Sequence, residues 1–232
     1  MAEPVLEARD VTRILPGPVP VTLVADISLS IGRGEFVAIA GPSGSGKSSL
    51  LYLLGLLDVP TRGRVLLEGR DTTEMDADEL ADLRLRRLGF VFQFHFLLPE
   101  FTVLDNIMVP MRRLGGRPVR AMHARAVEIL ESLGMESEIN KRPDQLSGGQ
   151  RQRAAIARAL ANDPLVVLAD EPTGNLDTRS GHIVFDIFAR LAREMGKTVV
   201  TVTHDTTLAA ETDRRILIVD GRVAEPAESA TH

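Results

Sequence analysis

Residues 36–54 constrain the fold more than any other stretch, because they place an apolar run, a glycine-rich turn and a second apolar run in unbroken order. The first run, Phe36–Ala40, is short and continuously apolar. This pattern is typical of a strand buried on both faces of a parallel sheet. The second run, Ser49–Leu54, predicts a buried helix. The glycines between the runs allow the backbone to wrap closely around a bound group.

The turn matches the pattern G-x-x-x-x-G-K-[ST], in which backbone N–H groups and a helix N-terminus surround phosphate groups. In this pattern the Lys47 side chain meets the β- and γ-phosphates, and the Ser48 hydroxyl binds Mg²⁺. A glycine-rich turn with a surface lysine is the alternative, but the flanking strand and helix favour a nucleotide site. The predicted nucleotide-binding residues are Gly41, Pro42, Ser43, Gly44, Ser45, Gly46, Lys47, Ser48 and Ser49.

Length, charge and cysteine content exclude several classes of protein. The chain has 232 residues, a net charge of −5 and no cysteine. Its length suits one large α/β domain or two small ones. The lack of cysteine excludes disulfides and cysteine-based zinc sites and suits a reducing cytosol, and the negative charge argues against a general nucleic-acid binder. The first residues do not resemble a secretion signal, and the longest apolar runs are shorter than the roughly 20 residues that span a bilayer. We therefore expect any membrane role to come through a partner chain.

The rest of the chain alternates predicted strands and helices around a mostly helical middle. Val5–Arg13 is expected to be an edge strand, and a hairpin is expected around Asp220-Gly221. Further strands are predicted at Thr22–Ile31, Gly63–Gly69, Gly89–Gln93, Leu165–Ala169 and Thr198–Thr203, and helices at Ala77–Leu88, Val119–Leu133, from Ser147 and at Gly181–Glu194. This order predicts an α/β fold whose parallel core carries a helical insertion. No internal repeat or linker separates independent domains.

A phosphate-binding loop needs a second protein ligand for magnesium, and an aspartate at the end of an apolar strand is the usual source. Asp170 ends the apolar run Leu165–Ala169 and is the candidate. Glu171 follows directly, where its carboxylate could polarise a water for in-line attack on the γ-phosphate. Acidic pairs at strand ends are often caps or solvated turns, but the upstream loop favours the catalytic interpretation.

Two further polar residues, Gln93 and His204, end predicted strands. Alone, the histidine would be a hydrogen-bonded structural residue and the glutamine a surface amide. Ligands of open α/β sheets, however, bind beyond the carboxyl ends of the strands. Both residues are therefore candidates for contact with the γ-phosphate and for positioning water and magnesium.

Residues 146–150 form a second turn suited to an anion. Ser147 and Gln150 fit a capping box, and the glycines between them leave N–H groups free at a helix N-terminus. An ordinary cap needs only the serine, so the glycines alone leave both interpretations open. Two phosphate-type sites in one chain suggest a shared nucleotide. The candidate residues are Leu146, Ser147, Gly148, Gly149 and Gln150.

Phenylalanines gather in one short window after the strand that ends at Gln93. They form either a small local hydrophobic core or an exposed surface that binds a partner protein. The five residues are Phe90, Phe92, Phe94, Phe96 and Phe101.

In their order and approximate spacing, these motifs resemble the ATPase subunits of ABC transporters. The resemblance covers essentially the whole chain, and LSGGQ between a Walker A and a Walker B motif is highly specific. It implies a P-loop NTPase (RecA-like) core with an antiparallel β subdomain, residues 1–93 and 160–232, and a helical signature-motif subdomain, residues 94–159. The matching motifs are the Walker A loop at 41–48, the Q-loop Gln93, the signature at 146–150, the Walker B run to Asp170 with Glu171, the D-loop at 175–177 and the switch His204.

The resemblance also implies a mechanism. ATP and Mg²⁺ would be the cofactors, and two ATP molecules would lie in a head-to-tail homodimer, each between the Walker A of one subunit and the signature of the other. Closure by ATP and reopening by hydrolysis would move separate integral-membrane permease subunits. The ATPase would be cytoplasmic, peripheral on the inner face of the cell membrane, with the phenylalanine window facing the permease.

Individual roles follow from the same resemblance. Glu171 would be the general base, His204 would contact the γ-phosphate, and Asp177 would couple the two sites across the interface. Gln93 would link the nucleotide to the helical subdomain. It would also belong, with Ser48 and Asp170, to the magnesium site.

A finer resemblance connects residues 93–102 and 169–177 to the lipoprotein-releasing and macrolide-exporting branch, whose members power mechanical membrane machines. The first stretch favours the lipoprotein-releasing type. One position departs from the family: an aromatic residue after the first strand usually stacks on adenine, and Ile14 stands there. We expect weaker or less adenine-selective nucleotide binding.

Other classes explain the sequence less fully. A regulatory or structural ATPase that signals through a membrane partner, as in cell-division relatives, needs the same motifs and stays open. DNA-repair and chromosome ATPases with this signature need long coiled-coil insertions, which the chain lacks. A small-molecule kinase has no use for LSGGQ.

Overall fold

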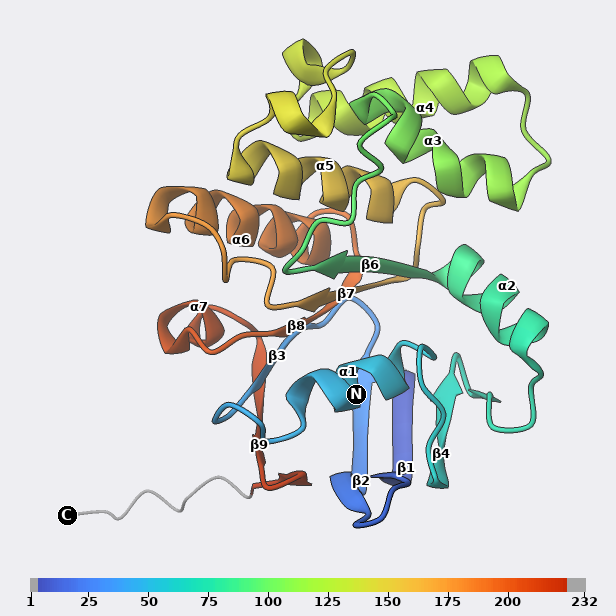
Figure 1. Ribbon diagram of the computed structural model, residues 1–232, viewed down its shortest axis with the longest axis vertical. Coiled ribbons are helices and arrows are strands. Elements are labelled where there is room, and N and C mark those ends of the chain that lie inside the picture. The colour runs from blue at the N-terminus through green and yellow to red at the C-terminus, as the bar shows by residue number, and fades with distance from the viewer. Residues whose placement is uncertain (1–3, 225–232) are drawn as a thin grey trace.

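A mixed six-stranded sheet forms the centre of the molecule (Figure 1). The computed structural model describes residues 4–224. The strands of this sheet, in spatial order, are β10 (Arg222–Val223), β9 (Arg214–Val219), β3 (Phe36–Ala40), β8 (Thr198–Val202), β7 (Val166–Asp170) and β6 (Leu88–Phe92). Neighbours from β9 to β6 are parallel, and β10 returns antiparallel to β9 as a hairpin. The predicted parallel core and terminal hairpin are confirmed.

The register of the parallel strands aligns their carboxyl ends. Phe92 of β6 lies opposite Asp170 of β7, and Asp170 lies opposite Val202 of β8. The residues that follow these strands therefore share one edge of the sheet. Strands β3, β7 and β8 are buried on both faces, since every residue except Ala40 and Asp170 at the strand ends is buried.

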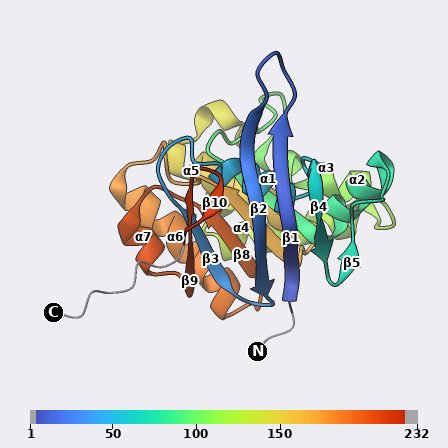
Figure 2. The ribbon, with the colours of Figure 1, turned by 90° about the horizontal axis from the view of Figure 1, so that it is seen from below.

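A second, antiparallel sheet has the order β2 (Val21–Gly32), β1 (Pro4–Leu15), β4 (Arg62–Leu67) and β5 (Arg70–Asp71). Figure 2 shows β1 between β2 and β4. The prediction that residues 5–13 form an edge strand is therefore wrong. Strand β1 carries the charged residues Glu7, Arg9 and Asp10 although it lies inside the sheet, because an antiparallel sheet exposes one face to solvent.

The helices connect and cover these sheets, and most lie where the sequence predicts them. The first begins at Lys47, two residues before the predicted start, because the left-handed Gly46 turns the chain directly into it. The helices are α1 (Lys47–Leu54), α2 (Ala77–Arg87), α3 (Val103–Leu114), α4 (Val119–Ser132), α5 (Gly148–Leu160), α6 (Thr178–Arg193) and α7 (Thr206–Ala210), with short 3-10 turns at Glu136–Glu138 and Pro143–Gln145.

Helices α3 and α7 are not anticipated by the sequence pattern. Thr102 caps α3 through a hydrogen bond from the backbone of Asp105, and Val103, Ile107 and Met111 form its buried stripe. Pro110 lies inside this helix and obscures the helical signal. The short α7 is capped by Asp205.

Two hydrophobic cores flank the six-stranded sheet. Val167 and Val199 pack on one face with α3, α4, α5 and α6. Their neighbours Val166 and Val200 point to the other face, toward α1 and the antiparallel sheet. Figure 1 shows α5 and α1 on opposite sides of the sheet.

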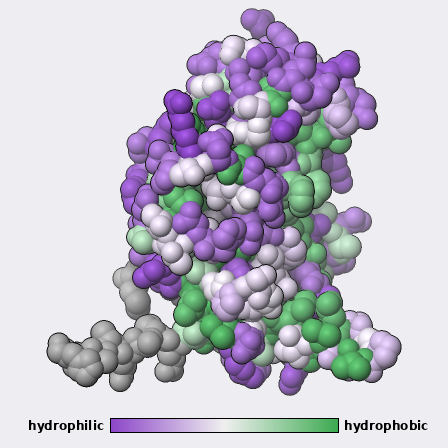
Figure 3. All heavy atoms as spheres, turned by 60° about the vertical axis from the view of Figure 1, so that its left-hand side comes forward, coloured by the Kyte–Doolittle hydropathy of each residue, from purple (hydrophilic) through white to green (hydrophobic). Residues whose placement is uncertain are grey.

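The outer surface of the helical part is mostly hydrophilic on the face drawn in Figure 3, whereas apolar residues gather toward the lower end, near the strands. Within residues 4–224, no helix combines the length and the apolar character needed to cross a membrane.

Candidate nucleotide and metal site

The edge formed by the carboxyl ends of β6, β7 and β8 collects the predicted site residues. Gln93 follows β6, Glu171 follows β7, and His204 comes two residues after β8. The loop at residues 41–46 joins β3 to α1 at the same end of the sheet, because β3 is parallel to β8. The sequence-based expectation that these residues lie along one edge is confirmed.

The glycine-rich loop depends on glycine at two close approaches. Gly41 has a φ of 146° and Gly46 a φ of 96°. A Cβ atom at Gly41 would collide with the carbonyl oxygen of Ile218, and one at Gly46 with that of Leu23. The neighbouring strands therefore press on this loop, and only glycine fits at these positions.

The loop is also held from both sides by hydrogen bonds. The Lys47 ammonium is buried and donates to the carbonyl oxygen of Pro42 at 2.7 Å. The backbone of Gly221, in the turn between β9 and β10, donates to the carbonyl of Ser45 at 2.9 Å. The terminal hairpin thus supports the back of the loop, while the lysine lies across it.

A hydroxyl and a carboxylate meet at the start of α1. The Ser48 hydroxyl donates to Oδ1 of Asp170 at 2.8 Å, across 122 positions of sequence. Hard oxygen ligands of this kind suit Mg²⁺, which usually takes one or two protein oxygens and completes its shell with phosphate and water. The described residues contain no group of three or more His, Cys, Asp or Glu side chains arranged for a metal. The pair fits a magnesium ion that is shared with a nucleotide.

Tyr52 is a third residue at this point, and sequence reasoning missed it. Its hydroxyl donates to Oδ2 of Asp170 at 2.7 Å. Burial, and then the hydrogen bond and negative charge of Asp170, raise the pKa of Tyr52 to about 12. The available signal was spacing, because Ser48 and Tyr52 are four residues apart on one helix and so share a face.

Glu171 and His204 lie together. Nδ1 of His204 is 3.4 Å from Oε2 of Glu171. Glu171 has a φ of 44°, which is unusual for a residue other than glycine, and its N–H donates to the carbonyl of Val202 at 3.1 Å. A strained backbone of this kind persists only where its surroundings fix it, and it is typical of functional sites.

Gln93 lies at the expected edge and contacts Asn175 there. Its Nε2 donates to Oδ1 of Asn175 at 3.2 Å, and Nδ2 of Asn175 donates back to the Gln93 carbonyl at 3.4 Å. Among the described residues, it makes no hydrogen bond to Ser48 or Asp170. The glutamine is tied to the turn that precedes α6.

The turn at residues 146–150 begins α5 with the predicted capping box. Ser147 Oγ accepts from the Gln150 backbone at 3.2 Å, and Gln150 Oε1 accepts from the Ser147 backbone at 2.8 Å. The amide of Gln150 also donates to the buried Glu138 at 2.9 Å. A Cβ atom at Gly149 would lie 3.0 Å from the Ser180 hydroxyl, so α6 packs closely against this turn.

Asp177 caps α6. It accepts hydrogen bonds from the backbone and the hydroxyl of Ser180 at 2.9 and 2.7 Å, and these bonds lower its pKa. It lies beside the signature turn, because Asp177, Ser147 and Gly149 line the same hollow.

The signature turn and the glycine-rich loop of one chain do not face a common hollow. Of the glycine-rich loop, Gly41 lines a cavity of about 580 Å³ together with His204, whereas Ser147, Gly149 and Gln150 of the signature turn line another. The turn lies at the start of α5 and the loop leads into α1, and these helices pack on opposite faces of the sheet. The two phosphate-type sites are therefore separate within the chain.

Ile14 lies near the end of β1, opposite Thr22 of β2. It is half-buried, and its N–H donates to the hydroxyl of Thr61 at 3.0 Å. The residues around it on the β1–β2 hairpin are apolar and exposed, with Val19 at 79% and Val21 at 53%.

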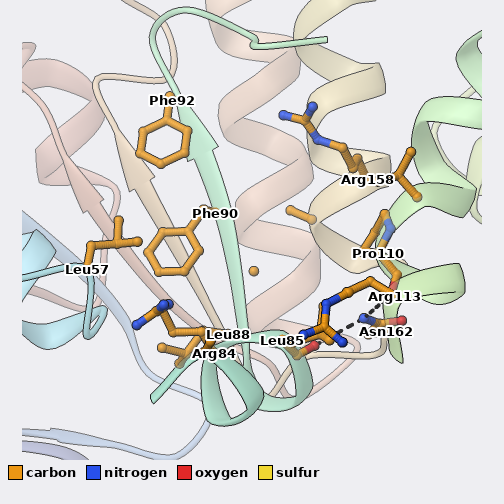
Figure 4. A pocket seen from close by; sticks show the side chains of 14 residues that line it. Leu57, Arg84, Leu85, Leu88, Phe90, Phe92, Pro110, Arg113, Arg158 and Asn162 are labelled. Atoms are coloured by element: carbon orange, nitrogen blue, oxygen red, sulfur yellow. Dashed lines mark hydrogen bonds between the residues drawn. The ribbon is translucent and has the colours of Figure 1, made fainter. Parts of the chain in front are cut away.

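A separate groove of about 430 Å³ lies between α2, β6, α3 and α5 (Figure 4). Phe90, Phe92 and Leu57 form its apolar wall, and the guanidinium groups of Arg84, Arg113 and Arg158 surround it. Arg158 donates to the carbonyls of His95 and Phe96 at 2.8 and 2.5 Å, and Arg84 donates to that of Leu56 at 2.6 Å. The Arg113 guanidinium makes no hydrogen bond or ion pair within residues 4–224.

The phenylalanine window divides between two environments. Phe90 and Phe92 are half-buried and stacked, with ring centroids 5.9 Å apart. Phe94 and Phe96 are 64% and 63% exposed. The window therefore contains both a small local cluster and an exposed aromatic surface.

Comparisons with known proteins agree with this geometry. The family model described as ABC transporter matches residues 24–174. A lipoprotein-releasing system ATP-binding protein of Aquifex aeolicus is 48% identical over 96% of this chain and 97% of its own length. One from Chlorobium chlorochromatii is 51% identical over 88% of this chain and 82% of its own.

A solved ATP-binding cassette, a dimer in a post-hydrolysis state with ADP and Pi, is 42% identical. It superposes with a TM-score of 0.88 over 95% of this chain and 97% of its own. The fold is therefore that of the P-loop ATPase cassettes, and the chain belongs to the ABC transporter family.

Proposed function

We propose that this protein is the ATP-hydrolysing subunit of a membrane transporter, that it acts as a head-to-tail homodimer, and that it drives a separate permease. The observation that carries the proposal is the hydrogen bond from Ser48 to Asp170. It joins the phosphate-binding loop to the Walker B strand and forms an oxygen-lined place for a metal. Glu171 and His204 lie directly beyond that strand.

In this function the residues divide the chemistry. The N–H groups of residues 41–48 and the Lys47 ammonium would hold the phosphates, and Ser48 and Asp170 would hold Mg²⁺. The bound metal neutralises phosphate charge. Glu171 would accept a proton from the water that attacks the γ-phosphorus, as the bond from that phosphorus to the bridging oxygen breaks.

His204 has a place in the same scheme. Its ring lies against the Glu171 carboxylate, which keeps both side chains at the strand edge. From there the imidazole would contact a γ-phosphate oxygen. Gln93 would couple the nucleotide site to the turn before α6 through its hydrogen bond to Asn175.

The separation of the signature from the loop supports the homodimer. Because one chain does not bring both to one hollow, a second copy would supply residues 146–150 to each nucleotide. The free N–H groups at the start of α5 suit the added phosphate charge. The similar cassette solved with ADP and Pi is a dimer.

The groove of Figure 4 is the proposed docking place for the permease. It is apolar along β6, it is bordered by arginines, and the ring of Phe92 in its wall lies 5.5 Å, centroid to centroid, from that of the exposed Phe96. Residues 94–159 would move with the docked segment, because Arg158 of α5 holds the carbonyls of His95 and Phe96. The protein would thus be peripheral at the inner face of the membrane.

The similarity to lipoprotein-releasing ATP-binding proteins, at 48–51% identity, favours lipoprotein release as the transport task. The test is purification of the complex from detergent-solubilised membranes with a tagged chain. We expect a permease and a bound lipoprotein to copurify. Copurification of a permease without lipoprotein, under conditions that preserve the complex, would contradict this substrate.

A matched pair of variants tests the docking place. Phe96→Ala should reduce permease recovery at least severalfold while ATP hydrolysis by the isolated subunit stays unchanged, because the exposed ring contributes little to the fold. Val19→Ala, at an even more exposed apolar residue on the β1–β2 hairpin, should leave recovery unchanged. Equal recovery with both variants would exclude this surface.

A further inference from the structure

Asp170 receives a hydroxyl on each of its two carboxylate oxygens. Ser48 donates to Oδ1 at 2.8 Å, and Tyr52 donates to Oδ2 at 2.7 Å. Both donors come from α1, one turn apart, whereas Asp170 ends β7. The carboxylate is therefore fixed at both oxygens by a single helix.

The tyrosine is itself held in place. Its ring meets the edge of the Phe92 ring, with centroids 6.5 Å apart and planes at 64°. Its backbone carbonyl accepts from Leu57 at 2.9 Å and from Asp58 at 3.3 Å, where α1 ends. The hydroxyl is thus presented to Asp170 by a ring and a backbone that have little freedom to move.

The second hydrogen bond matters because of the torsion that it restrains. The χ2 angle of an aspartate is broad and weakly restricted. Ser48 alone would leave Oδ2 free to rotate, and Ser48 is itself a proposed metal ligand. Tyr52 is also a neutral donor, so it orients the carboxylate without cancelling the negative charge that would attract a cation.

We propose that Tyr52 is a positioning residue for the metal: it fixes the rotamer of Asp170 so that Oδ1 stays on the Ser48 side, where the metal is proposed to bind. This inference rests on the proposed function. Hydrogen-bond partners of metal ligands typically contribute about 10-fold to 100-fold in metal affinity. Tyr52 acts through Asp170 and touches neither nucleotide nor metal.

Tyr52→Phe removes the hydroxyl and retains the ring. We expect this variant to bind Mn²⁺ about 10-fold more weakly in the presence of a non-hydrolysable ATP analogue, measured by electron paramagnetic resonance. Binding of the analogue without metal should be unchanged. In an Asp170→Asn background the same substitution should cause no further loss, because the group through which the tyrosine acts is gone.

A second measurement observes the contact directly. The chain has one tyrosine and no tryptophan, so its ultraviolet fluorescence comes from Tyr52 alone when it is excited at wavelengths that phenylalanine does not absorb. A carboxylate that accepts the phenol proton quenches this emission. Asp170→Asn should therefore increase the tyrosine fluorescence of the metal-free protein, whereas Glu171→Gln, at the next residue, should leave it unchanged.

The outcomes separate the two claims. Equal Mn²⁺ affinity in the wild type and Tyr52→Phe, or unchanged emission in Asp170→Asn, would overturn the role of Tyr52 and leave the proposed function intact. A wild-type protein that binds no Mn²⁺ with the analogue would overturn the proposed function itself. Circular dichroism of each variant shows whether the fold is preserved.

Discussion

At the scale of single residues, the shared edge of the sheet places unlike groups within reach of one another. Asp170 is hydrogen-bonded to two hydroxyls, while Glu171, the next residue, turns away through a positive φ toward His204. Adjacent carboxylates are thereby given different surroundings. This difference suits one carboxylate for a metal and the other for a water.

The ionisation of Tyr52 is a direct test of those surroundings. Its folded-state pKa is raised from 10.0 to about 12, so the folded protein favours the protonated phenol. This contribution to stability is complete below the unfolded-state pKa and is lost as the pH rises through the folded-state value. At pH 10, phenolate absorbance should be nearly absent in the folded protein and should appear on denaturation. Half-ionised tyrosine in the folded protein at that pH would contradict the contact.

The aliphatic side chain of Ile14 leads to a second prediction at the scale of single residues. An aliphatic residue offers no ring to stack on a base, and stacking of aromatic residues on bases is worth about 1–3 kcal/mol in nucleic-acid complexes. Ile14→Tyr should therefore tighten ATP binding by about tenfold and raise the preference for ATP over GTP, measured by equilibrium titration. Unchanged affinity and preference in a folded variant would show that the base lies elsewhere.

At the scale of elements, the parallel strands and their glycine-rich loop are predictable because buried strands need continuous apolar runs and the loop needs glycine. Helix α3 is harder. Its cap, Thr102, and its buried stripe are visible in the sequence, but Pro110 and the preceding phenylalanines indicate a loop. The place of β1 within its sheet depends on partners far along the chain, which local patterns do not encode.

The part of the loop that leads directly into α3 is anchored by the side chain of Asn106. Asn106 is buried, accepts from the backbone of Leu98 at 2.7 Å and donates to the carbonyls of Leu98, Phe101 and Thr102. Asn106→Ala should lower the free energy of unfolding by about 1–3 kcal/mol, because it leaves buried backbone groups without partners. Phe94→Ala, in the same loop but exposed, should change it by less than about 0.5 kcal/mol. Urea denaturation compares the two, and equal effects would refute the anchoring role.

At the scale of the whole molecule, the candidate site is only half predictable from one chain. The motifs at residues 41–48, 93, 170–171 and 204 meet along one edge, as their positions after strands predict. Tyr52 could not be assigned, because its role depends on the distance between α1 and β7. The signature lies at the start of α5, which packs on the other face of the sheet from α1, and in the proposed function a second copy brings it to the nucleotide.

The completion of each nucleotide site by a second copy is the central claim. Glu171→Gln keeps the size of the side chain but removes the base, so it should bind ATP without hydrolysing it. With saturating ATP and Mg²⁺, sedimentation velocity should show this variant as a dimer, and adding Ser147→Arg at the signature should return it to a monomer. A Glu171→Gln protein that binds ATP and remains monomeric would contradict the shared site.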